Sequence, residues 1–188
     1  IEKIAKKQNV DFYRGDEDNV LKRFIDAANQ FNLQKVIRIC SDNPFLDTKS
    51  IKLLIEYFNY SHADYVGFRI NNIPSIKTHY GFWPEIVNLD ALQKVAILTN
   101  EKIYLEHVTN FIYSFPNYFD IKFLDGPSYV ENNKDIRLTI DTKEDFELAK
   151  EIMLKLPDNY TIKEIINVIE SNPDYKIRML KQINANTK

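Results

Sequence analysis

The chain has 188 residues, a length that fits one ordinary globular domain with enough material for a buried core. Hydrophobic residues make up 44% and charged residues 28%, which is typical of folded proteins, and the net charge of −2 argues against broad attraction to nucleic acid or membrane surfaces. A single cysteine, Cys40, excludes an internal disulfide framework, and no apolar run approaches the roughly 20 residues that cross a bilayer. We therefore expect a cytoplasmic protein that binds neither nucleic acid nor membrane.

Strand and helix patterns alternate along the chain. The predicted strands are residues 10–13, 35–41, 63–68, 82–89, 118–124 and 135–140. The predicted helices are residues 17–31, 48–58, 90–98, 102–115, 143–153, 161–171 and a last one starting at Pro173. This alternation predicts a three-layer α/β sheet. Residues 1–156 are expected to form the main domain, and residues 157–188 a helical appendage whose apolar stripe needs a partner surface, either in the same domain or in a second subunit.

Two aspartates follow predicted strands. Asp42 comes after residues 35–41, and Asp141 comes after residues 135–140. Ligands of α/β sheets bind at the carboxyl ends of the strands, and two carboxylates arriving there commonly hold Mg²⁺ against phosphates. Arg38 shares the strand face of Asp42. An alternative is that both aspartates only cap helices, because Asp before Asn-Pro or Thr is common turn chemistry. Their spacing alone leaves the two interpretations open.

Other polar positions are weaker candidates. Arg14-Gly15 ends a predicted strand and can approach a nucleotide or sugar, or can simply open an acidic helix start. His107 lies off the apolar stripe of its helix and can contact a substrate or be exposed without a role. Glu85 follows the only tryptophan after a long loop. Zinc-type Cys/His spacing, a Walker loop, a Gly-x-Gly-x-x-Gly sequence and a Gly-x-Ser-x-Gly elbow are all absent from the sequence.

Four stretches together resemble the cytidylyltransferase family that includes the spore-coat polysaccharide biosynthesis proteins and the CMP-sialate and CMP-Kdo synthetases. The matching stretches are residues 12–24, 36–47, 106–109 and 137–147. The resemblance covers roughly residues 1–155 and is strongest to the spore-coat branch. It implies a Rossmann-like nucleotide-diphospho-sugar transferase fold with a mixed, mostly parallel sheet. It also implies transfer of CMP from CTP to a sugar acid or related glycan precursor with release of pyrophosphate.

The resemblance also implies roles for individual residues. Asp42 and Asp141 would bind Mg²⁺ on the nucleotide phosphates, and the chain would act as a homodimer. The residues it implies as nucleotide or substrate contacts are Arg14, Gly15, Arg23, Glu85 and His107. Arg38, which shares the strand face of Asp42, is expected to bind there as well.

The family's nucleotide-binding loop, rich in Arg, Gly and Lys, has no counterpart in these residues and would lie upstream of Ile1. We therefore expect the family's first strand and loop to be missing from this chain, and the chain alone to be inactive. Two other functions remain open at this point. One is a glycosyltransferase that uses a sugar nucleotide, and the other is a degenerate, non-catalytic domain that binds a nucleotide-sugar.

Overall fold

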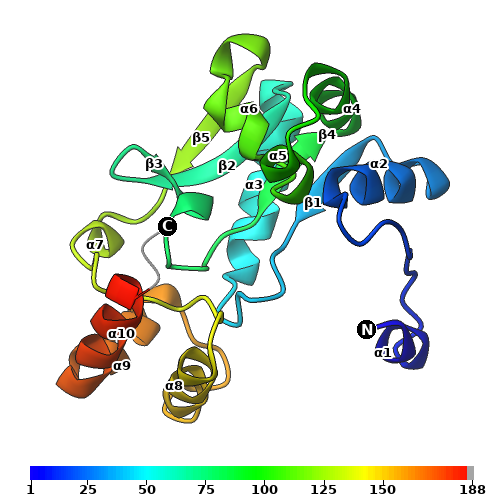
Figure 1. Ribbon diagram of the computed structural model, residues 1–188. Helices are drawn as coiled ribbons and strands as arrows, with labels where there is room; N and C mark the ends of the chain where they lie inside the picture. Colours follow the sequence, from blue (N-terminus) through cyan, green and yellow to red (C-terminus); the bar gives the residue numbers. More distant parts are fainter. Residues whose placement is uncertain (186–188) are drawn as a thin grey trace. The chain divides into compact units, whose positions relative to one another are not determined.

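The computed structural model describes residues 1–185 (Figure 1). The chain divides into two compact units. Unit 1 contains residues 1–36, 63–65 and 87–121, and unit 2 contains residues 37–62, 66–86 and those from 122 onward. No helix among the described residues is both long and apolar enough to cross a bilayer.

Unit 1 is mainly helical. Its helices are α1 (Glu2–Lys7), α2 (Val20–Gln30), α4 (Leu89–Leu98), α5 (Lys102–Glu106), α6 (Asn110–Ser114) and the short η2 (Pro116–Tyr118). Helix α2 packs against α4 and α5. It begins where the Asn19 side chain accepts the N–H of Lys22, whereas Asp16 accepts the N–H groups of Asp18 and Asn19 in the turn before it. The predicted strand at residues 10–13 is wrong, because this stretch forms a loop.

Unit 2 carries the remaining helices. They are α3 (Thr48–Ser61), η1 (Ser75–Lys77), α7 (Ser128–Glu131), α8 (Lys143–Met153), α9 (Ile162–Glu170) and α10 (Pro173–Ala185). Helix α8 begins with a capping box, in which the Thr142 side chain and the Asp145 side chain each bond to the other's backbone N–H. Helix α9 begins in the same way with Thr161 and Glu164. Both boxes have the motif's spacing, a threonine followed three residues later by an acidic residue.

The sheet contains β1 (Lys35–Arg38), β2 (Tyr65–Ile70), β3 (Ile73–Pro74), β4 (Glu85–Asn88) and β5 (Ile121–Asp125). Its strand order is β1-β4-β2-β3, and β5 also pairs with β2. Strands β1 and β4 are antiparallel: Leu89 N–H donates to Gln34 O at one end, and Arg38 bonds Glu85 at the other. Strand β3 is antiparallel to β2, with Ile70 opposite Ile73.

Strand β2 runs antiparallel to β4 but parallel to β5. The start of β2 meets the end of β4, where Asn88 N–H donates to Asp64 O. The same start meets the start of β5, where Asp64 N–H donates to Asp120 O, and Gly126 N–H donates to Arg69 O at the far end. Strands β1, β2 and β5 are therefore parallel, which confirms an α/β fold with a mixed sheet. We call the side where these three strands end and β4 begins the carboxyl edge.

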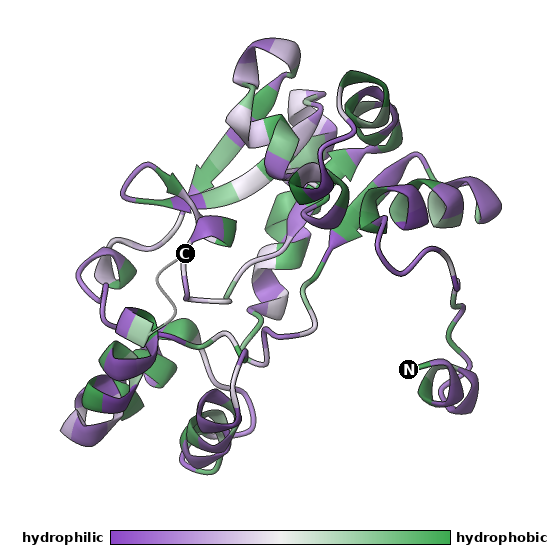
Figure 2. Ribbon diagram, viewed as in Figure 1, coloured by the Kyte–Doolittle hydropathy of each residue, from purple (hydrophilic) through white to green (hydrophobic). Residues whose placement is uncertain are grey.

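The last two helices bury their apolar stripe within unit 2. Helix α9 packs on α8 and α10, and its four inward isoleucines are Ile162, Ile165, Ile166 and Ile169. Figure 2 shows hydrophobic and hydrophilic residues alternating along α8, α9 and α10. From α10, Arg178 donates to Glu144 at 2.7 Å and to both carboxylate oxygens of Glu151 at 3.0 Å, so it clamps α8. The division into residues 1–156 and 157–188 stays a prediction.

The Arg178 clamp predicts acid sensitivity. Its hydrogen bonds hold the pKa of Glu151 below the usual 4.5, despite the opposing effect of burial. A carboxyl with a lowered pKa stabilises the fold above its unfolded pKa and loses that contribution as the pH falls through the folded value. Because Glu151 is partly exposed, Glu151→Gln should cost about 1 kcal/mol or less at neutral pH. In urea titrations that difference in unfolding free energy should shrink as the pH falls below 4.5 and disappear once the pH is below the folded pKa of Glu151.

The matched control is Glu147→Gln on the same helix. Among residues 1–185, Glu147 pairs only with exposed Lys150, at 3.2 Å. Its effect should be close to zero at every pH. Equal effects of the two substitutions would contradict a stabilising clamp.

Candidate functional site

Three segments of unit 2 that are far apart in the sequence meet beyond the end of β1. They are residues 42–47, 79–83 and 137–141. The N–H of Ile140 donates to the carbonyl of Asp42 at 2.9 Å, and the N–H of Leu138 donates to the carbonyl of His79 at 2.8 Å. Asp141 therefore comes directly after Ile140, whose backbone is hydrogen-bonded to that of Asp42. The structure brings together the two aspartates that the sequence singles out.

The local structure around both aspartates corrects the sequence prediction. Strand β1 ends at Arg38, so Asp42 lies not at the strand end but in the following turn, where Asn43 N–H donates to Cys40 O at 3.3 Å. Residues 135–140 form no strand. Their N–H groups bond to two separate segments rather than to one neighbouring strand, because this stretch crosses from residue 79 to residue 42.

Arg137 lies at the centre of this junction, and its side chain is 0% exposed. Its guanidinium donates to Asp145 Oδ1 at 2.8 Å and Oδ2 at 3.0 Å, and to Asp141 Oδ2 at 2.7 Å. A further nitrogen lies 2.9 Å from His79 Nδ1. The hydrogen bonds to Asp145 are the largest cause of a raised pKa of Arg137, so the guanidinium stays charged despite its burial.

Asp145 joins this charge to the start of α8. Its side chain is 5% exposed, and its Oδ2 accepts the N–H of Asp141 at 3.1 Å and the N–H of Thr142 at 2.9 Å. Burial alone would raise the pKa of Asp145. The hydrogen bonds from Arg137, Asp141 and Thr142 outweigh that effect and lower it. The carboxylate is therefore an ionised anchor for both the helix and Arg137.

A glycine is required where residues 79–83 approach the Asp42 turn. Gly81 has φ +65°, and a Cβ at this position would lie 3.0 Å from Asn43 Oδ1 and 3.4 Å from Thr139 Cγ2. Among the described residues, the Thr139 hydroxyl is the buried side-chain polar atom that lacks a hydrogen-bond partner. A hydroxyl two residues before Asp141 is therefore available to a ligand or an ordered water.

The two aspartates fit Mg²⁺. Within residues 1–185, the Asp42 side chain has no hydrogen-bond or ion-pair partner, and Asp141, whose side chain is 36% exposed, uses only Oδ2. Free carboxylate oxygens are the ligands that Mg²⁺ prefers, and proteins commonly bind it through one or two carboxylates plus substrate phosphates. Across the same residues, no group of three or more His, Cys, Asp or Glu side chains could hold a metal ion.

Arg38 and Glu85, both predicted to bind substrate, pair with each other across β1 and β4. Arg38 donates to Glu85 Oε2 at 2.8 Å, and their side chains are 17% and 2% exposed. The Glu85 carboxylate therefore reaches Arg38 rather than open solvent. Because Glu85 fixes it, the Arg38 guanidinium is held at the carboxyl edge.

Three further predicted residues belong to unit 1: Arg14 and Gly15 lie in the loop that leads to α2, and Arg23 lies within α2. Arg14 is exposed and pairs with Glu2 at 3.1 Å. Arg23 donates to the carbonyl of Asp16 at 2.9 Å. Gly15 packs closely on it, since a Cβ there would lie 3.0 Å from Arg23 Cγ. These contacts shape the loop, and the binding role of the three residues stays a prediction.

His107 lies where a predicted helix is broken. The sequence predicts one helix over residues 102–115, but the structure has α5 and α6 with residues 107–109 between them. His107 ends α5 and is exposed, and its carbonyl accepts the N–H of Asn110 at 2.7 Å. Val108 and Thr109 turn into the core instead. The break therefore orients His107 outward, and its substrate role stays a prediction.

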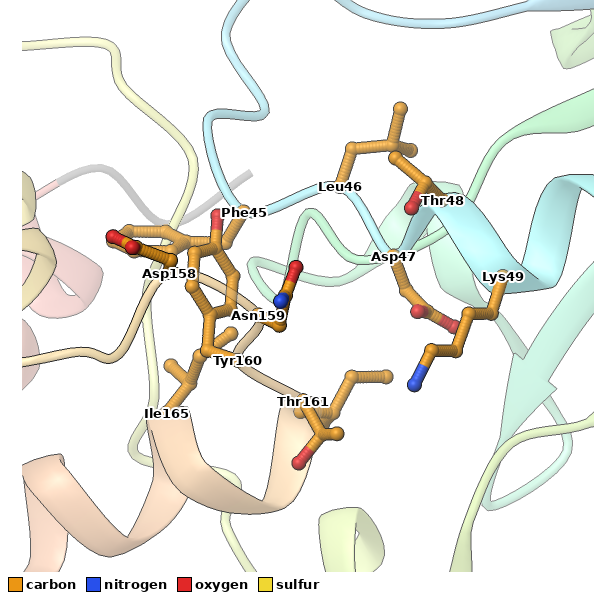
Figure 3. Close-up of a pocket in the computed structure, with 11 residues that line it drawn as sticks. Phe45, Leu46, Asp47, Thr48, Lys49, Asp158, Asn159, Tyr160, Thr161 and Ile165 are labelled. Carbon is orange, nitrogen blue, oxygen red and sulfur yellow. The ribbon is translucent and has the colours of Figure 1, made fainter.

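A pocket of about 430 Å³ lies between the starts of α3 and α9 in unit 2 (Figure 3). Its floor includes Phe45, whose ring meets that of Tyr160 edge-on. Asp47 and Lys49 project into it from the α3 side and Thr161 lies opposite. Apolar rings beside carboxylate, ammonium and hydroxyl groups can hold a small polar molecule. The sequence gives no signal for this pocket, because its two sides are more than a hundred residues apart.

The fold is shared with a solved protein. A cytidylyltransferase from Leptospira borgpetersenii serovar Hardjo-bovis superposes with a TM-score of 0.80 and 26% sequence identity. The match covers 93% of this chain and 71% of that one. The α/β architecture thus places the chain in the class of nucleotidyltransferases.

Sequence comparisons define the family more closely. The family model described as Cytidylyltransferase matches residues 1–177. An uncharacterized protein of Methanocaldococcus jannaschii is 34% identical over 189 residues, covering 100% of this chain and 72% of the relative. The spore coat polysaccharide biosynthesis protein SpsF of Bacillus subtilis is 33% identical over 171 residues, covering 89% and 68%. The chain belongs to the cytidylyltransferase family, as the sequence resemblance predicts.

Proposed function

We propose that the protein transfers CMP from CTP to a hydroxyl of a sugar acid or related glycan precursor, with Mg²⁺ and with release of pyrophosphate. The observation that carries this proposal is the junction that brings Asp42 and Asp141 together at the carboxyl edge. Family membership supports the nucleotidyl transfer, and the similarity to SpsF supports an acceptor used in polysaccharide biosynthesis.

In the proposed reaction, an acceptor hydroxyl oxygen forms a bond to the α-phosphorus of CTP. The bond from that phosphorus to the oxygen bridging to the β-phosphate breaks, pyrophosphate leaves, and the hydroxyl proton passes to solvent. This chemistry depends mainly on positioning and on neutralising charge, so it needs no protein nucleophile. When bound, Mg²⁺ supplies charge neutralisation at the phosphates.

In this proposal, residues of this chain position the metal ion and the substrates. Asp42 and Asp141 offer free carboxylate oxygens toward the metal. Arg38 offers a fixed positive charge at the same edge, suited to a phosphate or an acceptor carboxylate. A binding role for Arg14, Gly15, Arg23 and His107 toward nucleotide or acceptor is part of the same proposal. A homodimer and a cytoplasmic location belong to the same proposal, although α9 buries its apolar stripe within its own unit and so gives the dimer no support.

The decisive experiment measures pyrophosphate release by the full-length protein from each of the four nucleoside triphosphates, with Mg²⁺ and a panel of sugar acids. We expect release from CTP alone, dependent on both the metal and an acceptor. A parallel measurement tests whether the same protein binds or hydrolyses UDP-sugars and GDP-sugars. Binding or hydrolysis of these without turnover of CTP would indicate a glycosyltransferase, and tight binding of a nucleotide-sugar without any turnover would indicate a non-catalytic domain. Either outcome contradicts the proposal.

A further inference from the structure

We infer that Arg137 is a positioning residue that fixes Asp141 in the orientation needed to bind the metal, and that Asp145 and His79 hold Arg137 in place for this task. This inference rests on the proposed function, because it assigns Asp141 to the metal.

The two oxygens of the Asp141 carboxylate have different surroundings. Arg137 holds Oδ2 at 2.7 Å, and Oδ1 has no partner among residues 1–185. A carboxylate held by one oxygen can no longer rotate freely, so its other oxygen is directed before the metal arrives. Groups that hydrogen-bond a metal ligand in this way orient it and tune its affinity.

Arg137 is itself held from two other sides. Two of its nitrogens grip both oxygens of Asp145, and a third lies 2.9 Å from His79 Nδ1. These contacts come from α8 and from residues 79–83, so two parts of unit 2 outside its own segment fix one planar group. The planar fork of arginine suits such a site, whereas lysine offers a single mobile charge.

A purely structural role explains only part of this arrangement. Asp145 alone satisfies the charge of Arg137 with two hydrogen bonds, and Asp145 already caps α8 without help. The nitrogen that bonds Asp145 Oδ2 is nevertheless also directed at Asp141. The hydrogen bond to Asp141 adds little to the stability of the fold, because Asp141 is partly exposed. It does restrict the rotation of the Asp141 carboxylate, whose other oxygen is free.

The test is Arg137→Lys in the full-length protein, with Mn²⁺ as the probe for the metal. In the presence of CTP, Mn²⁺ affinity measured by electron paramagnetic resonance should fall about tenfold or more. The Mg²⁺ concentration that gives half-maximal pyrophosphate release should rise by the same factor, and excess Mg²⁺ should restore most of the rate. Asp145→Asn, which weakens the grip on the guanidinium but keeps an acceptor for the α8 cap, should shift Mn²⁺ affinity in the same direction. It provides the test if Arg137→Lys does not fold.

The matched control is Arg178→Lys, since Arg178 also holds two carboxylates of α8 but touches neither aspartate. It should lower the melting temperature and leave Mn²⁺ affinity unchanged. If Arg137→Lys and Asp145→Asn lower only the melting temperature, Arg137 is structural and the inference fails while the proposed function stands. Loss of Mn²⁺ affinity in a protein that never turns over CTP would uphold the positioning role and reject the proposed function. A wild-type protein that binds no Mn²⁺ would overturn both.

Discussion

Replacing Asp42 or Asp141 by asparagine is expected to reduce metal-dependent pyrophosphate release from CTP by at least 10²- to 10³-fold, the order of loss seen when one group that stabilises transition-state charge is removed. Asparagine keeps the shape of the side chain but removes the negative charge that the metal needs. The measurement is the steady-state rate at saturating CTP, acceptor and Mg²⁺. Asp125→Asn is the control, because Asp125 ends β5 and pairs only with Arg69.

The same two variants separate the metal role from helix capping. Asp42 has no side-chain partner in the described part of the chain, so Asp42→Asn should change the unfolding free energy by no more than about 0.5 kcal/mol. Asparagine caps a helix about as well as aspartate does, so two residues that were only caps would keep the full rate in these variants and lose ~1 kcal/mol of stability only when replaced by alanine. Full activity in both variants would therefore reject the metal assignment and restore the capping interpretation.

Replacing Glu85 by alanine is expected to lower the free energy of unfolding by about 3 to 5 kcal/mol. The substitution removes the carboxylate that pairs with the largely buried Arg38 guanidinium, and breaking a buried ion pair by removing one partner is strongly destabilising. Urea denaturation monitored by the fluorescence of Trp83 measures the change. The exposed pair Arg69–Asp125 supplies the control, since Asp125→Ala should change the stability far less than Glu85→Ala.

A double substitution tests whether the Glu85 effect comes from the charge. Replacing both Arg38 and Glu85 by methionine removes the guanidinium along with its partner. Much of the stability should then return, because apolar pairs of similar volume often replace buried ion pairs at little cost. A Glu85→Ala variant no less stable than Asp125→Ala would show that the pair contributes no more than a surface contact.

Local patterns predicted most elements of the fold. The two capping boxes at Thr142 and Thr161 were predictable because their chemistry lies within four residues of sequence. The break at residues 107–109 was not, because the apolar spacing runs through it and only the packing of Val108 interrupts the helix. The segment before Asp141 has the alternation of a strand but lacks a neighbouring strand, and a pairing partner is not encoded locally.

The candidate site was predictable in part. The sequence singled out Asp42 and Asp141, because each follows a predicted strand. It gave no reason to connect them with Arg137 and His79, because the contact between these two side chains depends on how distant stretches of chain meet. The role of Asp145 was hidden by its capping signal, since one carboxylate both caps α8 and holds Arg137.

The clamp between α10 and α8 gives the end of the chain influence over the start of that helix. Arg178 grips Glu144 in the first turn of α8, next to Asp145, which accepts the backbone N–H of Asp141. Asp141, in contrast, is held by Arg137 and by the carboxylate of Asp145, and neither of these contacts involves Arg178. Asp42 lies in its own turn, away from the clamp. Changes in the attachment of α10 should therefore alter the stability of the helical part of unit 2 without altering the metal pair.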